Sequence, residues 1–151
     1  MHIIGILLAA GRAQRFGSPK LLHPLADGTP IGVAAARSLI RAVPHSVAVV
    51  RPGDRDLVTA LSDAGLTIVE NPLADQGLGT SLAAGVRATV NAGGWLVTLA
   101  DMPWVDSSTI RRLADGLSDG AAIIAPVYRG RRGHPVGFAA NWEERLQRMD
   151  G

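Results

Sequence analysis

The chain has 151 residues, so the default expectation is one domain covering 1–151. Its hydrophobic fraction of 47% indicates a globular chain rather than a disordered one, and the absence of cysteine excludes disulfides, thiolate metal sites and cysteine nucleophiles and fits a cytoplasmic protein. The net charge of +2 comes from arginines scattered among acids, which gives weak support for nucleic-acid binding.

Apolar runs typical of buried strands alternate with helical patterns along the chain. The first run, residues 3–10, is too short to span a membrane and is followed by Gly11 and Arg12. In chain order the predicted elements are a strand at 2–9, a polar loop at 11–29, a helix at 31–42, a strand at 46–50, a helix at 54–64, a strand at 66–70, a helix at 78–92, a strand at 95–100, a helix at 107–117 capped by Ser107 or Ser108, a strand at 121–126, a turn at 128–134, a short strand at 135–139 and a helix at 140–149.

This alternation predicts an α/β fold of three layers, with a doubly wound, mostly parallel, Rossmann-like sheet between two layers of helices. Ligands of such sheets bind outside the carboxyl ends of the strands. The loops expected to carry function are therefore 10–20, 71–81 and 101–106, because each of them follows a predicted strand.

The opening loop combines small residues with positive charge, which suits backbone and side-chain binding of phosphate. A solvated surface loop is the alternative, and the spacing matches neither GxxxxGK[ST] nor GxGxxG. Lys20 is the single lysine of the chain, and a compact ammonium can follow a phosphate oxygen where a planar guanidinium does not fit. The residues concerned are Ala9, Ala10, Gly11, Arg12, Arg15 and Lys20.

Two further loops contain candidate polar ligands. Asp101 follows a buried strand, where a Mg²⁺ ligand or a turn aspartate is equally expected. The stretch 71–81 could shape a base pocket through Asn71 and Ser81, or form a plain loop with a helix cap at Thr80 or Ser81.

The stretch 128–138 holds the one basic cluster, Arg129–Arg132, followed by His134. It suits a phosphate-bearing acceptor site, a nucleic-acid patch or a solvated turn, and His134 suits a structural histidine better than a base. The chain has no HExxH and no GxSxG motif, so it is better equipped to bind phosphates and one metal ion than to form a covalent intermediate.

Four motifs in this order resemble the molybdenum cofactor nucleotidyltransferases, over about residues 3–138. They are LAAG-x₃-R-F-G-x₂-K from Leu8 to Lys20, N-x₅-G-x₃-S from Asn71 to Ser81, DMP at Asp101–Pro103 and GRRGHPV at Gly130–Val136. The LAAG start with Ala10 is similar to the cytidylyltransferase branch, whereas the guanylyltransferase branch more often has LAGG.

The resemblance implies a fold of the nucleotide-diphospho-sugar transferase type and a role for each matching residue. Backbone groups of Leu8, Ala10 and Gly11 would contact the nucleotide, and Arg15 and Lys20 would hold its triphosphate. Asn71 and Ser81 would lie near the base and ribose, and Asp101 would bind Mg²⁺. The acceptor side would consist of Arg132, Gly133 and His134.

The activity implied is transfer of CMP from CTP to the phosphate of molybdopterin or its molybdenum form, with release of pyrophosphate. Expected partners are CTP or GTP, a phosphorylated pterin and a molybdenum hydroxylase or its chaperone, with no nucleic acid and no membrane. Guanylyl transfer, sugar-phosphate nucleotidyl transfer and a non-catalytic nucleotide-binding module are the alternatives. Family members usually continue to a further acidic residue near the metal, so a C-terminally truncated form, or a metal site completed by another group, is expected.

Overall fold

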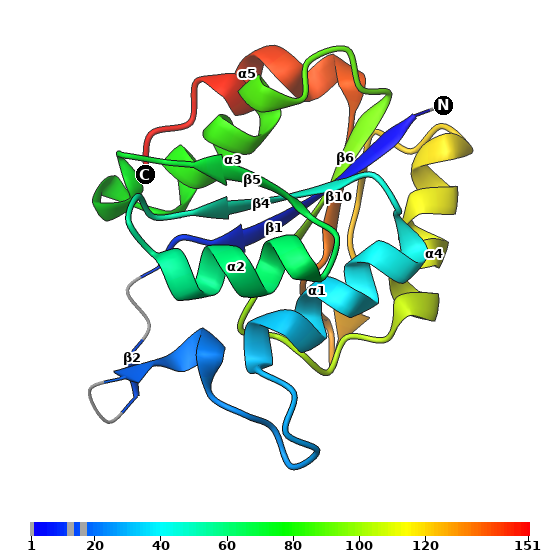
Figure 1. Ribbon diagram of the computed structural model, residues 1–151. Helices are drawn as coiled ribbons and strands as arrows, with labels where there is room; N and C mark the ends of the chain where they lie inside the picture. The colour runs from blue at the N-terminus through cyan, green and yellow to red at the C-terminus, as the bar shows by residue number, and fades with distance from the viewer. Residues whose placement is uncertain (1, 12–13, 16–17) are drawn as a thin grey trace.

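A six-stranded sheet forms the centre of the computed structural model, which describes residues 2–11, 14–15 and 18–151. Its strand order is β5-β4-β1-β6-β10-β7 (Figure 1). Four neighbouring strands run parallel, and β10 runs antiparallel to β6 and β7. The strands are β1 (Ile3–Ala9), β4 (Ser46–Val50), β5 (Thr67–Glu70), β6 (Gly94–Leu99), β7 (Ile123–Ile124) and β10 (Val136–Ala139). The predicted mostly parallel sheet is confirmed.

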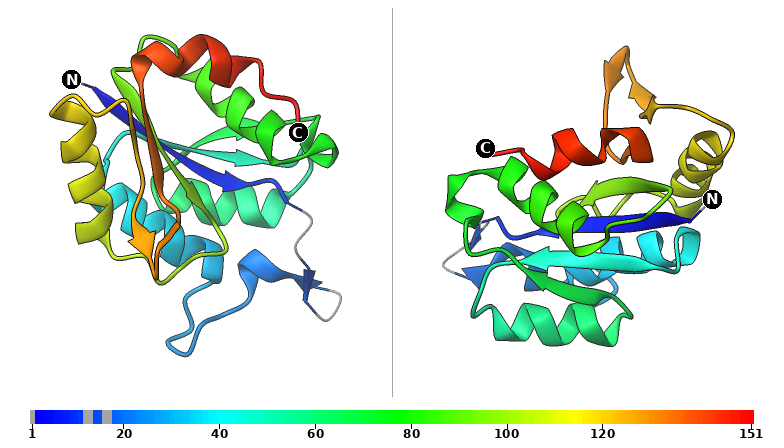
Figure 2. Two further views of the ribbon diagram at one scale, coloured as in Figure 1. Left: turned by 180° about the vertical axis from the view of Figure 1, so that it is seen from behind. Right: turned by 90° about the horizontal axis from the view of Figure 1, so that it is seen from above.

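Helices cover both faces of this sheet, as the alternation of strands and helices predicts (Figures 1 and 2). One face packs against α1 (Ile31–Ala42), α2 (Arg55–Asp63) and α4 (Ser107–Ser118). The other packs against α3 (Leu78–Ala88) and α5 (Glu143–Gln147). The architecture is therefore the three-layer α/β arrangement.

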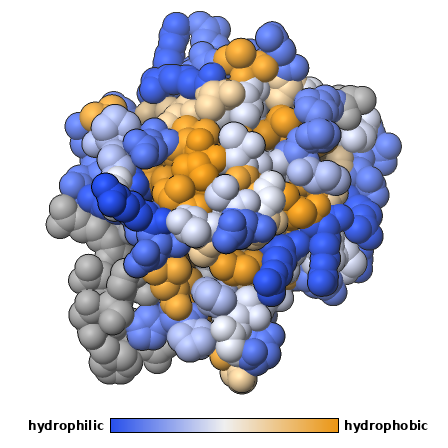
Figure 3. Space-filling model, viewed as in Figure 1, coloured by the Kyte–Doolittle hydropathy of each residue, from blue (hydrophilic) through white to orange (hydrophobic). Residues whose placement is uncertain are grey.

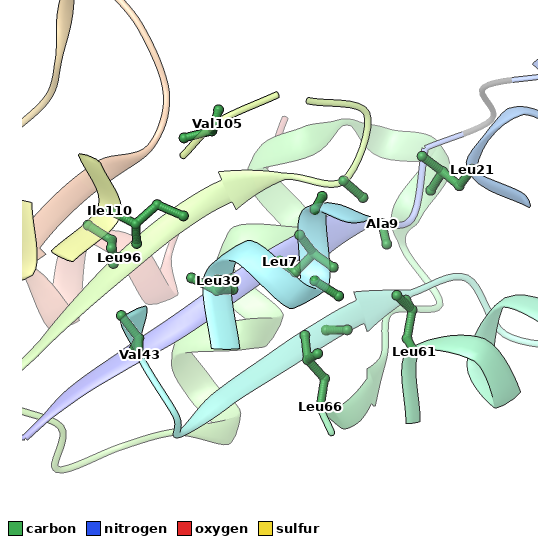
Figure 4. Close-up of a cluster of buried hydrophobic side chains, with 14 of the residues drawn as sticks. Leu7, Ala9, Leu21, Leu39, Val43, Leu61, Leu66, Leu96, Val105 and Ile110 are labelled. Atoms are coloured by element: carbon green, nitrogen blue, oxygen red, sulfur yellow. The ribbon is translucent and has the colours of Figure 1, made fainter. Parts of the chain in front are cut away.

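Strand β1 explains how the two layers share the core. Its side chains alternate: Leu7 and Ala9 belong to the cluster under α1 (Figure 4). Ile6 and Leu8 belong to the cluster under α3. A central strand that is buried on both faces has no polar side, which is why the sequence of β1 is apolar throughout.

The first loop contains more structure than the sequence predicts. Strands β2 (Gln14–Arg15) and β3 (Ser18–Pro19) pair with each other, and a 3₁₀ turn, η1 (Lys20–Leu22), follows them. Leu21 in this turn is buried in the core cluster under α1. Burial of one leucine thus ties the end of the polar loop to the body of the domain.

The C-terminal third differs most from the expected elements. The predicted strand 121–126 is limited to the two residues of β7, and the predicted turn 128–134 is a hairpin of β8 (Val127–Tyr128) and β9 (Arg131–Arg132). This hairpin projects from the body of the domain (Figure 2). The predicted last helix divides into η3 (Ala140–Trp142) and α5.

Two helix boundaries also differ. Helix α3 ends at Ala88 rather than at 92, and Asn91 has a positive φ of 71°, which an α-helix does not accommodate. The cap of α4 is Asp106, whose carboxylate accepts a hydrogen bond from the Ser108 N–H at 3.2 Å. The predicted serine caps are therefore wrong, and both serines lie inside the first turn of the helix.

Strand β5 forms one edge of the sheet, and hydrophilic side chains surround apolar patches on the face that contains it (Figure 3). Ile68 and Val69 in this strand are half-buried.

In the part of the chain that the structure describes, none of the helices has the length and apolarity needed to cross a membrane.

Candidate functional site

The three loops expected to carry function meet at the carboxyl edge of the sheet, where its parallel strands end. They follow β1, β5 and β6, and these strands are parallel, so their carboxyl ends share that edge (Figure 1). Ala100 donates a backbone hydrogen bond to Leu8 O at 3.1 Å, which extends the pairing of β1 with β6 up to the point where the first and third of these loops begin. The topology thus places the opening loop beside the DMP segment.

Lys20 and Asp101 face each other at this edge. The Lys20 Nζ lies 4.0 Å from the Asp101 Oδ2, and the two side chains are 36% and 44% exposed. Lys20 begins η1, and Asp101 follows the last residue of β6, Leu99, by two positions. A cation and a carboxylate that are partly open to solvent and this close can contact one polyanionic ligand and its metal ion together.

A cavity of about 230 Å³ lies next to this pair. Its wall includes Ala9 at the end of β1, Gly11 just after it and Asp101. Residues this small allow an anion to approach the main chain closely. Ala10, in the same turn, is buried. The lining residues are Leu8, Ala9, Gly11, Leu21, Leu78, Leu99 and Asp101.

A second cavity, of about 190 Å³, adjoins the first because both are lined by Leu8 and Leu78. Its wall is mainly apolar and includes Phe138 and His134. Burial lowers the pKa of the His134 imidazole, and the charge of Asp101 acts in the opposite direction. His134 therefore lies within electrostatic reach of Asp101 and is neutral at pH 7.

A third cavity, of about 650 Å³, lies under the β8–β9 hairpin and shares Val136 and Phe138 with the second. Arg132 lines this third cavity and is exposed. Gly133 donates its N–H to Pro126 O at 2.9 Å. Of the predicted acceptor-side residues, His134 thus lies near Asp101, whereas Arg132 belongs to the hairpin end of the same row of cavities.

Asn71 and Ser81 are 3% and 2% exposed and bind each other. The Asn71 Nδ2 donates to Ser81 Oγ at 2.9 Å and to Thr80 Oγ1 at 3.0 Å, and the Asn71 Oδ1 accepts from Leu73 N–H at 3.0 Å. The Asn71 amide therefore fastens the two ends of the 71–81 loop. This segment includes η2 (Ala74–Gln76) and the first turn of α3, where Leu78 and Gly79 line the second cavity.

The structure does not describe the side chains of two arginines that the sequence analysis assigns to phosphate binding. Arg12 lies outside the described residues, and Arg15 is placed by its backbone in β2.

Arg51 is a polar residue of this edge that the sequence analysis does not single out. It follows β4, its Nη1 donates to Ala10 O at 3.1 Å, and its Nη2 forms an ion pair with Asp75. These partners lie in two other loops, so local sequence pattern carries no signal for the contact.

Asp101 suits a metal ion that arrives with phosphates. Among the residues that the structure describes, no group of three or more His, Cys, Asp or Glu side chains could hold a metal ion. Mg²⁺ is usually bound by one or two carboxylates together with substrate phosphates and water. One carboxylate beside the first cavity fits that pattern.

Comparison with known proteins identifies the family of the chain. The family described as "MobA-like NTP transferase domain" matches residues 5–151. The chain is 30% identical to the molybdenum cofactor cytidylyltransferase of Escherichia coli, covering 87% of this chain and 67% of that one. It is 35% identical to a probable molybdenum cofactor guanylyltransferase of Haloferax mediterranei, with 82% and 59% covered. It is also 32% identical to the nicotine blue oxidoreductase of Paenarthrobacter nicotinovorans, with 89% and 69% covered.

Solved structures give the same fold. A nucleotidyl transferase from Methanothermobacter has a TM-score of 0.81 at 27% identity, covering 99% of this chain and 77% of that one. Rv0371c of Mycobacterium tuberculosis, solved as a complex with manganese, has a TM-score of 0.79 at 26% identity, with 100% and 78% covered. The predicted nucleotide-diphospho-sugar transferase type of fold is thereby confirmed. The chain belongs to the MobA-like NTP transferase family and is a nucleotidyltransferase.

Proposed function

We propose that the protein transfers CMP from CTP to the phosphate of molybdopterin, or of its molybdenum form, and releases pyrophosphate. The observation that carries this proposal is the Lys20–Asp101 pair, 4.0 Å apart, beside a cavity lined by Ala9 at the end of β1 and Gly11 just after it. In this proposal the Leu8–Gly11 backbone binds the nucleotide, and Lys20 and Arg15 hold the triphosphate.

The proposed reaction requires correct positioning of the two substrates and positive charge near the phosphates, and it does not require a strong base. A phosphate monoester has a second pKa near 6, so the attacking oxygen is already anionic at pH 7. This oxygen attacks the α-phosphorus of CTP, and the bond between the α-phosphorus and the oxygen that bridges it to the β-phosphorus breaks. The negative charge of the departing pyrophosphate then grows beside Lys20. Asp101 would hold a Mg²⁺ ion, which supplies charge to neutralise the phosphates when bound.

The choice of CTP over GTP depends on Ala10. The LAAG opening is similar to the cytidylyltransferase branch, and the match to the Escherichia coli cytidylyltransferase supports this choice. The comparable match to a probable guanylyltransferase keeps GTP as the second candidate.

The acceptor would enter along the second and third cavities. His134 stands at the Asp101 end and Arg132 at the hairpin end, with the apolar surface of Val136 and Phe138 between them. A planar heterocycle can lie on such a surface while its phosphate is directed towards the metal ion that Asp101 would hold. Neutral His134 can donate or accept a hydrogen bond there.

Pyrophosphate release tests the proposal. Purified protein is incubated with each of CTP, GTP, ATP and UTP, with Mg²⁺ or Mn²⁺, with and without a molybdopterin acceptor. We expect release from CTP that depends on both acceptor and metal. Faster pyrophosphate release from GTP than from CTP would indicate guanylyl transfer in place of cytidylyl transfer. Release with a sugar phosphate in place of the pterin would indicate that the acceptor is a sugar phosphate.

The remaining outcomes separate other classes of protein. Metal-dependent nucleotide binding without any pyrophosphate release would indicate a non-catalytic module. Because one relative is named as an oxidoreductase, the same preparation is assayed for oxidation of NADH and NADPH. The proposal predicts none, since the chain lacks a GxGxxG fingerprint.

A further inference from the structure

Arg51 joins three loops at the carboxyl edge of the sheet, where the parallel strands end. It lies directly after β4, donates from Nη1 to Ala10 O at 3.1 Å in the loop after β1, and pairs through Nη2 with Asp75 in the loop after β5. Its side chain is 23% exposed and that of Asp75 is 57% exposed. The guanidinium is therefore held from both sides at the rim of the domain.

The contact with Ala10 determines the direction of the next donor. The peptide group between Ala10 and Gly11 is planar and trans, so its C=O and its N–H point in opposite directions. Arg51 binds the C=O, which turns the Gly11 N–H away from the guanidinium. Gly11 lines the first cavity together with Asp101. Fixing one side of this peptide thus fixes a backbone donor on the other side.

Asp75 contributes by holding the guanidinium plane. An arginine fork presents its N–H groups in a rigid plane, so a carboxylate on one terminal nitrogen restricts where the other terminal nitrogen points. Lysine, with a single ammonium group on a flexible stem, cannot reproduce both contacts with the same geometry.

We propose that Arg51 is a positioning residue that orients the Ala10–Gly11 peptide so that the Gly11 N–H faces the phosphates of the nucleotide. This inference rests on the proposed function, because it assumes that the cavity beside Gly11 receives those phosphates. It assigns Arg51 no contact with the substrate. The two terminal nitrogens of Arg51 contact Ala10 and Asp75.

The test compares ligands with and without phosphates. Dissociation constants for CTP, inorganic tripolyphosphate and cytidine are measured by calorimetry in the wild type and in Arg51→Met. Loss of one oriented donor to a charged group corresponds to a weakening of about tenfold or more. We expect that loss for CTP and tripolyphosphate and an unchanged value for cytidine.

Two further variants sharpen the comparison. Asp75→Asn removes a charge from an exposed pair and should weaken tripolyphosphate binding by at most about fivefold. Arg55→Met is the matched control, because Arg55 is an exposed arginine at the start of α2, and its binding constants should equal those of the wild type. If Arg51→Met does not fold, Arg51→Lys replaces it, with the same selective loss for phosphate ligands expected.

Wild-type affinity for tripolyphosphate in the Arg51 variant would overturn the inference. An equal loss for all three ligands, accompanied by a lower melting temperature, would also overturn it, because it would show a merely structural role. If the wild type itself does not bind CTP, the proposed function fails instead, which keeps the two failures distinct.

Discussion

Lys20 is the one lysine in a chain that otherwise uses fourteen arginines, and its ammonium lies 4.0 Å from Asp101. If Lys20 stabilises the leaving pyrophosphate, Lys20→Ala should lower the rate of pyrophosphate release about 10²- to 10³-fold, as loss of one transition-state donor does. The measurement is steady-state release at saturating CTP.

The matched variant for this position is Lys20→Arg. It keeps the positive charge but spreads it over a planar fork, so we expect partial activity. An Ala variant that turns over like the wild type would remove Lys20 from the mechanism.

His134 gives a prediction about pH. Burial lowers its folded-state pKa below the ordinary value of 6.5, while Asp101 opposes the shift. Below pH 6.5 the unfolded chain binds the proton more readily than the folded chain, so stability falls as pH decreases from 6.5 towards the folded-state pKa. His134→Gln should reduce this acid-side loss.

Chemical denaturation at a series of pH values between 7 and 5 measures the effect on stability. NMR titration should place the His134 pKa below 6.5, and lower still in Asp101→Asn, where the opposing charge is gone. A value at or above 6.5 in the wild type would contradict the burial that the structure shows.

Residues were predictable from the sequence where the signal is local. Lys20 and Asp101 each follow a recognisable strand-and-loop pattern, so the sequence could place both at the carboxyl edge of the sheet. Arg51 was not predictable, because its partners Ala10 and Asp75 lie in distant parts of the sequence and are brought together by sheet order. For Asn71 the sequence suggested a base contact as one possibility but could not reveal that its amide is occupied within the loop.

At the scale of elements, the 71–81 loop depends on one amide. Asn71→Ala removes the partner of Thr80, Ser81 and Leu73 at a buried site, so the free energy of unfolding should fall by about 2–3 kcal/mol. Urea denaturation measures this loss. Asn141→Ala, at an exposed position, is the control and should change stability by less than about 0.5 kcal/mol. Equal stability of the two variants would show that the Asn71 hydrogen bonds are not needed.

The elements differ in how far the sequence predicts them. Helix α1 is found at the residues expected, 31–42, because its apolar face repeats with helical period over its whole length. Strand β7 is two residues rather than the six predicted, since β-propensity at 121–126 does not decide how many residues find a partner in β10. The β8–β9 hairpin turns at Arg129 and Gly130, both with positive φ, and arginine gives no turn signal of that kind.

At the scale of the whole molecule, metal and nucleotide should stabilise the fold together. Asp101 is one carboxylate, and the described residues offer no cluster of three such ligands, so Mg²⁺ or Mn²⁺ alone should leave the melting temperature unchanged. CTP with metal at about 100 times its dissociation constant should stabilise the protein by about 2.7 kcal/mol. Thermal denaturation checks this, with Asp101→Asn as the control that should lose the metal-dependent part. A large shift with metal alone would contradict a site that is completed by the nucleotide.

A crystal structure with a non-hydrolysable CTP analogue and Mn²⁺ tests the central claim most directly, because the anomalous signal of manganese locates the metal. The account predicts Mn²⁺ bound to the Asp101 carboxylate and to phosphate oxygens, with the Lys20 ammonium on the same phosphates and the Gly11 N–H directed at them. Manganese away from Asp101, or a triphosphate in the cavity under the β8–β9 hairpin, would contradict it.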